Sequence, residues 1–127
     1  MGNWHPIRFD FILRKAFMKK HKIKNFTKGW FIGDFEPSLL QTKHFEVGVK
    51  YYKAGDTEDC HMHKTATEYT VIVKGKIMMF NKVFKKGDII EVEPNEYTDF
   101  VALKDTITLV VKTPSVKGDK YLVEINK

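Results

Sequence analysis

The residues best able to do chemistry are His61, His63 and Glu68, which fall within eight consecutive positions of the chain. A strand sends alternate side chains to opposite faces, so His61 and His63 would share one face. Two neutral imidazoles and an ionised carboxylate suit divalent iron, manganese, nickel, copper or zinc, and they leave coordination positions open for water, oxygen or substrate. The spacing therefore predicts a metal site with vacant positions.

A hairpin is the element that would bring the glutamate back beside the histidines. Residues 64–67 are enough to turn the chain, and residues 68–73 have the β-branched and aromatic content of a returning strand. Thr70 shares a strand face with Glu68, so we expect both to line a cavity. Glycines flank the unit in the pattern Gly55-x5-His61-x-His63-x4-Glu68-x6-Gly75.

This pattern resembles the first signature of the cupin superfamily. Residues 87–103 resemble a weakened second signature, and the resemblance as a whole covers residues 45–113. It implies a small antiparallel jelly-roll β-barrel in which the two signatures lie on neighbouring strands. In cupins the first signature supplies two histidines and one glutamate, and the second usually supplies one histidine.

The second signature departs from the common form where the fourth ligand is expected. Pro94 stands one residue late, and Glu96 takes the place of a glycine. Asp99 takes the place of the histidine, which makes it the candidate fourth metal ligand. Two nitrogens and two carboxylate oxygens form a harder donor set, which favours manganese or iron over copper. Alternatively, Asp99 could hold a ligand's imidazole ring in place or be a strand-end carboxylate in water.

The resemblance implies one divalent transition metal ion, which we expect to be iron, manganese, nickel or zinc. Glu68 and Asp99 are then the candidate catalytic residues, because a carboxylate at a metal site can move a proton. Tyr97 shares a strand face with Asp99, and Tyr97 and Thr70 are the candidate contacts to a bound cofactor or small molecule. Burial with the hydroxyl satisfied by the backbone is the alternative for Tyr97.

From residue 29 onward the sequence divides into short strands and turns. Alternation and β-branched content predict strands at 45–52, 68–73, 76–80, 89–93, 97–103, 106–113 and 120–125, with a tight turn at 81–82. The pattern is typical of an antiparallel sandwich or barrel, and alone it does not separate an immunoglobulin-like sandwich from a jelly roll. The cupin resemblance favours an all-β jelly-roll barrel, with residues 29–127 as one domain.

The net charge of +6 is unevenly distributed along the 127 residues. Residues 1–28 carry +7 and residues 29–127 carry −1, so the excess belongs to a basic N-terminal extension. Apolar residues at helical spacing predict an amphipathic helix there, from about Asp10 to Lys20. Such a helix could lie on an anionic membrane or touch nucleic acid. We favour packing of its apolar face on the barrel or on a second subunit, and we therefore expect a homodimer.

Cysteine usage and hydropathy bear on the compartment. The single cysteine excludes an internal disulfide and agrees with a reducing environment. No run approaches the roughly 18 apolar residues of a membrane span, and the N-terminus lacks the apolar stretch of a secretory signal. We expect a cytoplasmic protein that has neither a membrane nor a nucleic acid as its partner.

Two classes of function fit these observations. The first is a small metalloenzyme with oxygenase, isomerase or lyase chemistry on a small molecule, in which the ion polarises the substrate or binds oxygen. The second is a non-catalytic module that binds a sugar or an organic acid, with or without metal, as a sensor or accessory domain. A metal-free variant of the first class would use His61 or His63 as a general base, oriented by Asp99.

Overall fold

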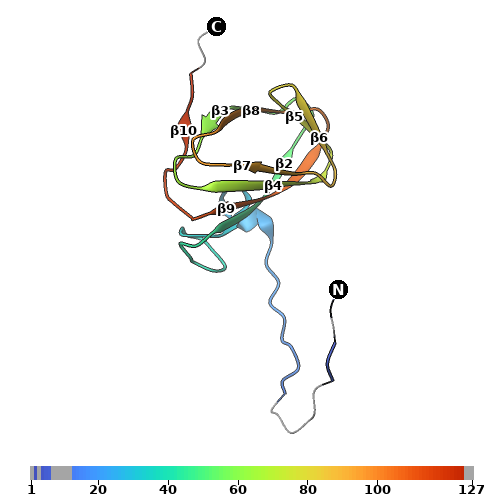
Figure 1. Ribbon diagram of the computed structural model, residues 1–127. Coiled ribbons are helices and arrows are strands. Elements are labelled where there is room, and N and C mark those ends of the chain that lie inside the picture. The colour runs from blue at the N-terminus through green and yellow to red at the C-terminus, as the bar shows by residue number, and fades with distance from the viewer. Residues whose placement is uncertain (1, 3, 7–12, 125–127) are drawn as a thin grey trace.

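The computed structural model describes residues 2, 4–6 and 13–124. Residues 30–122 contain two five-stranded antiparallel sheets that face each other (Figure 1). One sheet has the order β1-β2-β9-β4-β7 and the other β10-β3-β8-β5-β6. Two 3-10 helices, η1 (Ile23–Asn25) and η2 (Thr27–Gly29), precede the first strand. The strands are β1 (Trp30–Ile32), β2 (Glu46–Tyr52), β3 (Thr57–Met62), β4 (Thr67–Lys74), β5 (Lys76–Met79), β6 (Lys82–Lys85), β7 (Ile89–Val92), β8 (Tyr97–Ala102), β9 (Thr106–Thr113) and β10 (Tyr121–Leu122).

The architecture confirms the predicted all-β antiparallel fold, but the predicted closed barrel is wrong. Within the described part of the chain, no strand of one sheet pairs with a strand of the other, so the jelly roll is an open sandwich. The edge strands β1, β6, β7 and β10 are only two to four residues long.

A compact apolar core joins the sheets at one end of the sandwich. Its buried members come from β4 and β7 on one side and from β5 and β8 on the other: Ile72, Ile77, Ile90, Phe100 and Ala102. Ile72 and Ile77 are fully buried, with exposures of 0%. Burial of one such side chain stabilises the fold by about 1.5–3 kcal/mol.

The turn between β4 and β5 requires glycine for two reasons. Gly75 has a φ of 98°, a left-handed conformation that side chains other than glycine rarely adopt. A Cβ at this position would also lie 2.4 Å from the carbonyl oxygen of Asp105. The chain therefore breaks at Gly75, as the sequence predicts.

The hairpin between β5 and β6 turns one residue earlier than predicted. Met79 pairs with Lys82, which leaves Phe80 and Asn81 as a two-residue loop. Their φ values of 44° and 64° match a type I′ turn, whose twist suits a hairpin. Asn81 was expected to open this turn, but the left-handed residue before it is the bulky Phe80, which sequence preference does not favour there.

The predicted N-terminal helix is wrong where the structure describes it. Residues 13–22 have no helical structure and are exposed, and Asp10 and its two successors lie outside the described residues. A helix of this length gains most of its stability from packing an apolar face, and no such packing occurs along residues 13–22. In the described ranges, no helix is long and apolar enough to cross a membrane.

Candidate metal and ligand site

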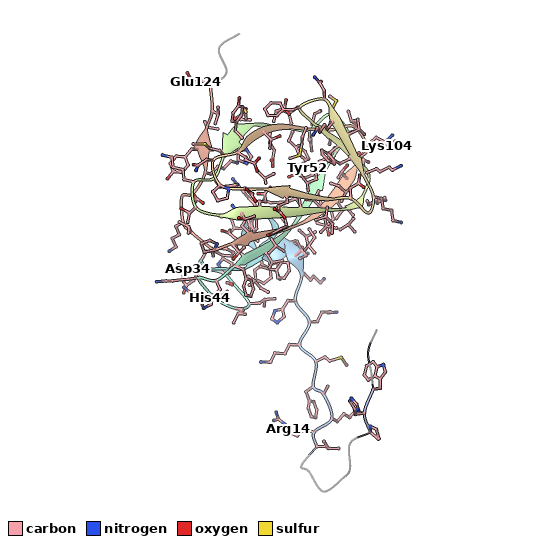
Figure 2. The ribbon with its side chains drawn as sticks, viewed as in Figure 1. Arg14, Asp34, His44, Tyr52, Lys104 and Glu124 are labelled. Atoms are coloured by element: carbon pink, nitrogen blue, oxygen red, sulfur yellow. The ribbon has the colours of Figure 1, made fainter. Side chains whose placement is uncertain are left out.

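A cavity of about 210 Å³ lies between the sheets, beside the apolar core. Side chains from both sheets line it, and Tyr52 of β2 projects into the space between them (Figure 2). The Tyr52 ring also packs on Phe100 of the core, with ring centroids 4.5 Å apart. The cavity and the core are therefore two neighbouring parts of one interior.

Most of the predicted site residues meet at this cavity. Those that line it are His61, His63, Glu68, Thr70 and Asp99. Tyr97 does not line it: its side chain is 47% exposed, and its ring meets Phe80 edge-on with centroids 5.6 Å apart. The proposed contact between Tyr97 and a bound molecule therefore has no support in the structure.

A β-bulge in β3 decides which side chains reach the cavity. Glu58 pairs with Phe100 and His61 pairs with Thr98, so two residues of β3 stand opposite Asp99 alone. The extra residue resets the alternation, and Glu58 lines the cavity together with His61. Strict alternation would separate these two side chains, which is why Glu58 was missed. Its carboxylate accepts a hydrogen bond of 2.9 Å from the Tyr52 hydroxyl.

His63 is held so that one ring nitrogen faces Glu68. Its Nδ1 contacts the carbonyl oxygen of Asp119, which can only accept, so Nδ1 must carry the proton. In the neutral ring Nε2 is then a bare lone pair. This atom is buried without a hydrogen-bond partner and lies 3.4 Å from Oε1 of Glu68. Two acceptors that face each other in a buried place call for a proton or a metal ion between or upon them.

The electrostatics of the pair agree with that requirement. The Glu68 carboxylate raises the pKa of His63, although burial opposes it. Burial raises the pKa of Glu68, but His63, Lys112 and Thr70 together outweigh it, and the pKa ends below its usual value. Without metal, the protein therefore favours a positive charge on His63 and a negative charge on Glu68.

Asp119 fastens the loop that presents His63. Its carboxylate accepts hydrogen bonds of 2.8–3.2 Å from the backbone N–H groups of Lys64, Thr65 and Ala66. These donors lower the pKa of Asp119, although burial by itself raises it. Because its backbone carbonyl also accepts from His63, Asp119 fixes both the loop and the imidazole. Nothing in the local sequence signals a partner 55 positions away.

Two imidazole nitrogens and a carboxylate are suitable donors for a divalent ion, although the side chains are not arranged around a single point. His61 is arranged like His63: its Nδ1 lies 2.9 Å from the carbonyl oxygen of Asp59, so Nε2 is free to bind a metal. The two imidazole rings lie 5.4 Å apart. Across residues 2, 4–6 and 13–124, no three His, Cys, Asp or Glu side chains converge closely enough to hold an ion. Binding therefore requires a shift of at least one side chain.

Asp99 has a structural partner in addition to its place at the cavity. Its Oδ1 accepts a hydrogen bond of 2.7 Å from the backbone N–H of Phe80, in the turn between β5 and β6. The side chain is exposed. Asp99 thus holds a turn whose left-handed residues need support, and its role as a metal ligand stays a prediction.

Comparisons with known proteins place this geometry in a fold family. No family model and no curated protein sequence matches the chain. A Klebsiella pneumoniae protein with a double-stranded β-helix domain is 17% identical, and the match covers 90% of this chain and 100% of that one with a TM-score of 0.65. The lyase DddQ, which acts on DMSP, from Ruegeria pomeroyi is 18% identical over 74% of this chain and 49% of its own, with a TM-score of 0.62.

A third solved structure extends the range of activities found on this fold. It is a sugar phosphate isomerase of the cupin superfamily from Silicibacter pomeroyi, 17% identical over 65% of this chain and 58% of its own, with a TM-score of 0.56. This chain spans about half the length of the lyase. Identities this low establish the fold alone. The chain has the double-stranded β-helix fold of the cupins.

Proposed function

We propose that the protein binds one divalent transition metal ion through His61, His63 and Glu68 and acts as an enzyme on a small molecule in the cavity. The observation that carries this proposal is the buried Nε2 of His63, which lies 3.4 Å from a Glu68 oxygen with no hydrogen-bond partner. When bound, the ion would supply Lewis acidity toward a carbonyl or hydroxyl oxygen of the substrate.

The chain's own residues hold these groups in place. The Thr70 hydroxyl donates a hydrogen bond of 3.2 Å to the second oxygen of Glu68 and so fixes the carboxylate. Asp119 orients His63 through its carbonyl oxygen. A Glu68 carboxylate kept ionised beside a substrate can accept a proton from it. The cavity of about 210 Å³ suits a small substrate, and the lyase and isomerase that share the fold support this choice.

Metal binding is tested on protein purified without added metal. We expect iron, manganese, nickel or zinc at about one ion per chain after titration, measured by mass spectrometry and calorimetry. His63→Ala and Glu68→Gln should each weaken binding at least about 100-fold, since each removes a donor atom. His44→Ala and Glu91→Gln are matched controls, because both side chains are exposed and neither lines the cavity. Failure of every divalent ion to bind stoichiometrically would refute the proposal.

A second measurement separates the metal from a proton. If a proton alone bridges the two groups, nitrogen NMR of His63 at neutral pH will show a doubly protonated ring that divalent ions do not change. If the ion binds, one ring nitrogen will lose its proton on titration.

Asp99→Ala tests the fourth ligand: a fall in metal affinity with the fold intact supports a role for Asp99 at the metal. Light scattering tests the predicted homodimer, and a monomer would contradict it.

A further inference from the structure

Two lysines share one aromatic ring at the cavity. The Nζ of Lys50 lies 4.8 Å from the centroid of Trp30, and the Nζ of Lys112 lies 5.0 Å from it. All three residues line the cavity that holds His61 and His63. Each cation gains from the negative face of the indole, but two like charges gathered on one ring repel each other.

The Trp30 ring packs against strand β2 at Gly48. Lys50 and Gly48 lie on one face of β2, and Lys112 stands on β9 opposite Glu46. A Cβ at position 48 would lie 2.7 Å from the Trp30 ring, so only glycine leaves room for the indole against β2. The absence of a side chain at Gly48 therefore allows the Trp30 ring to lie close to β2 and to both lysines.

Neither lysine lies within ion-pair distance of a carboxylate, although Glu58 acts on Lys50 and Lys112 acts on Glu46 and Glu68 over a longer range. The one ion pair among the described residues joins His63 to Glu68, so neither lysine contacts an acid at ion-pair distance. The acids that line the cavity are otherwise engaged: Glu58 accepts from Tyr52, and Asp99 accepts from the Phe80 N–H.

Further positive charge surrounds the same cavity. Two more lysines line it from separate segments: Lys28 of η2 and Lys120, which precedes β10. Both Lys50 and Lys112 are half-buried, and burial lowers the pKa of Lys50. Neither Nζ atom is a buried donor without a partner, so water or a bound ligand can accept hydrogen bonds from both ammonium groups. An anion is the ligand that would satisfy them.

We propose that Lys50 and Lys112 bind the carboxylate or phosphate group of a small organic anion, which lies on the Trp30 side of the cavity with its other end toward His61 and His63. The inference rests on the proposed function only in treating this anion as the molecule on which the site acts. The ammonium pair would supply charge-assisted hydrogen bonds, and the anion would relieve the repulsion between the lysines. The substrate class is thus an organic acid or a phosphate ester.

Binding is measured on metal-free protein by fluorescence of Trp30. The chain has two tryptophans, and Trp4 is 94% exposed, so the Trp4→Phe protein reports on Trp30 alone. Inorganic phosphate and malonate are the two probes, at constant ionic strength, with malonamide as the uncharged counterpart of malonate. We expect a saturable change with at least one anion and none with malonamide. A saturable response to phosphate alone selects a phosphate ester, and a response to malonate alone selects a carboxylate.

Variants then assign the binding to the lysine pair. Lys50→Met and Lys112→Met together should raise the Kd at least about 10-fold, and the double arginine variant should keep binding close to that of the native protein. Lys86→Met is the matched control, because Lys86 is exposed in the turn before β7. Circular dichroism confirms that each variant is folded. No saturable change in the native protein, or equal Kd values in the native and double methionine proteins, would overturn the inference.

The outcome is separable from that of the metal proposal. Anion binding without stoichiometric metal would leave the lysine site standing and refute the metal site. Metal binding without anion binding would do the reverse. The metal ligands His61, His63 and Glu68 are unchanged in every variant of the anion test, so a loss of anion binding cannot be caused by a missing metal ligand.

Discussion

The interior has an apolar core at one end and a polar cavity at the other, and strand β4 contributes side chains to both. Along the inward face of β4, Glu68, Thr70 and Ile72 follow one another at alternate positions. Ile72 is fully buried in the apolar core, whereas Glu68 lies in the cavity beside His63. Five residues of one strand thus lead from a region of apolar contacts to one where a histidine nitrogen and a carboxylate oxygen face each other.

The difference indicates how stability and function are divided. The apolar end gains free energy from burial and has no group that awaits a ligand. The polar end gains less, because it holds the charged groups of His63 and Glu68 away from water. A ligand that binds these groups would stabilise the folded protein, so ligand binding and stability should be linked only there.

The largest effect on stability should come from the apolar end. Ile72→Ala should lower the free energy of unfolding by about 3–4 kcal/mol, because it leaves a cavity among fully buried neighbours. Urea unfolding measures this, and metal bound per folded molecule should stay unchanged. Glu68→Gln should show the reverse, a smaller loss of stability and a loss of metal. Equal stability losses in the two variants would contradict the division.

Within the polar end, Asp119 should matter most for stability. Asp119→Ala leaves the three N–H groups of residues 64–66 without their acceptor, and we expect a loss of about 2–3 kcal/mol together with weaker metal binding. Asp105→Ala is the matched control, since the Asp105 carboxylate accepts from the single N–H of Ala54. A control that costs as much as Asp119→Ala would show that the loop does not depend on its carboxylate.

The pH dependence should separate the same carboxylate from its histidine neighbour. The folded-state pKa of Asp119 is lowered, so its contribution is complete above the unfolded value of about 4 and is lost as the pH falls through the folded value. The stability difference between native protein and Asp119→Asn should therefore shrink below about pH 4.

His63 should behave in the opposite way. Its folded-state pKa is raised, so in metal-free protein its contribution is present below about pH 6.5 and is lost as the pH rises through the folded value. Urea unfolding from acid to neutral pH measures both trends. For Asp119, a stability difference between native protein and Asp119→Asn that stays constant down to pH 3 would contradict the role of the Asp119 carboxylate.

The smallest effect should come from the residue that joins the two ends. Tyr52→Phe keeps the ring on Phe100 and removes only the hydroxyl that donates to Glu58. We expect a loss of about 1 kcal/mol, measured by urea unfolding. Tyr52→Ala also removes the half-buried ring and should cost more than Tyr52→Phe, but less than Ile72→Ala. If both variants cost the same, the hydroxyl rather than the ring carries the contribution of Tyr52.

Sequence reasoning found the parts of the site that depend on local spacing. His61, His63 and Glu68 meet at one cavity, as their spacing predicted. The predicted hairpin is wrong, because β3 and β4 belong to different sheets and face each other across the cavity without pairing. The antiparallel strands followed from alternation and β-branched content. Glu58 was not found, because the bulge that turns it inward comes from pairing with β8.

Features set by distant parts of the chain could not be predicted in this way. Alternation in β2 would favour burial of its valines, yet Lys50 and Tyr52 are the residues of that strand that line the cavity. The N-terminal helix was wrong, because an amphipathic pattern stabilises a helix only where a partner covers it. Asp99 was expected at the metal, and sequence alone did not reveal its bond to a turn 19 positions away.

The hydrogen bonds between Asp119 and the loop after His63 also affect the order in which the protein folds during synthesis. The two partners are separated by 53 to 56 positions, so the loop emerges from the ribosome well before the residue that fastens it. Closing so long a segment is among the slower contacts a small domain makes. We therefore expect the imidazole to gain its final orientation only after Asp119 has been made, so that a nascent chain stopped earlier would contain the ligand residues without holding them in place.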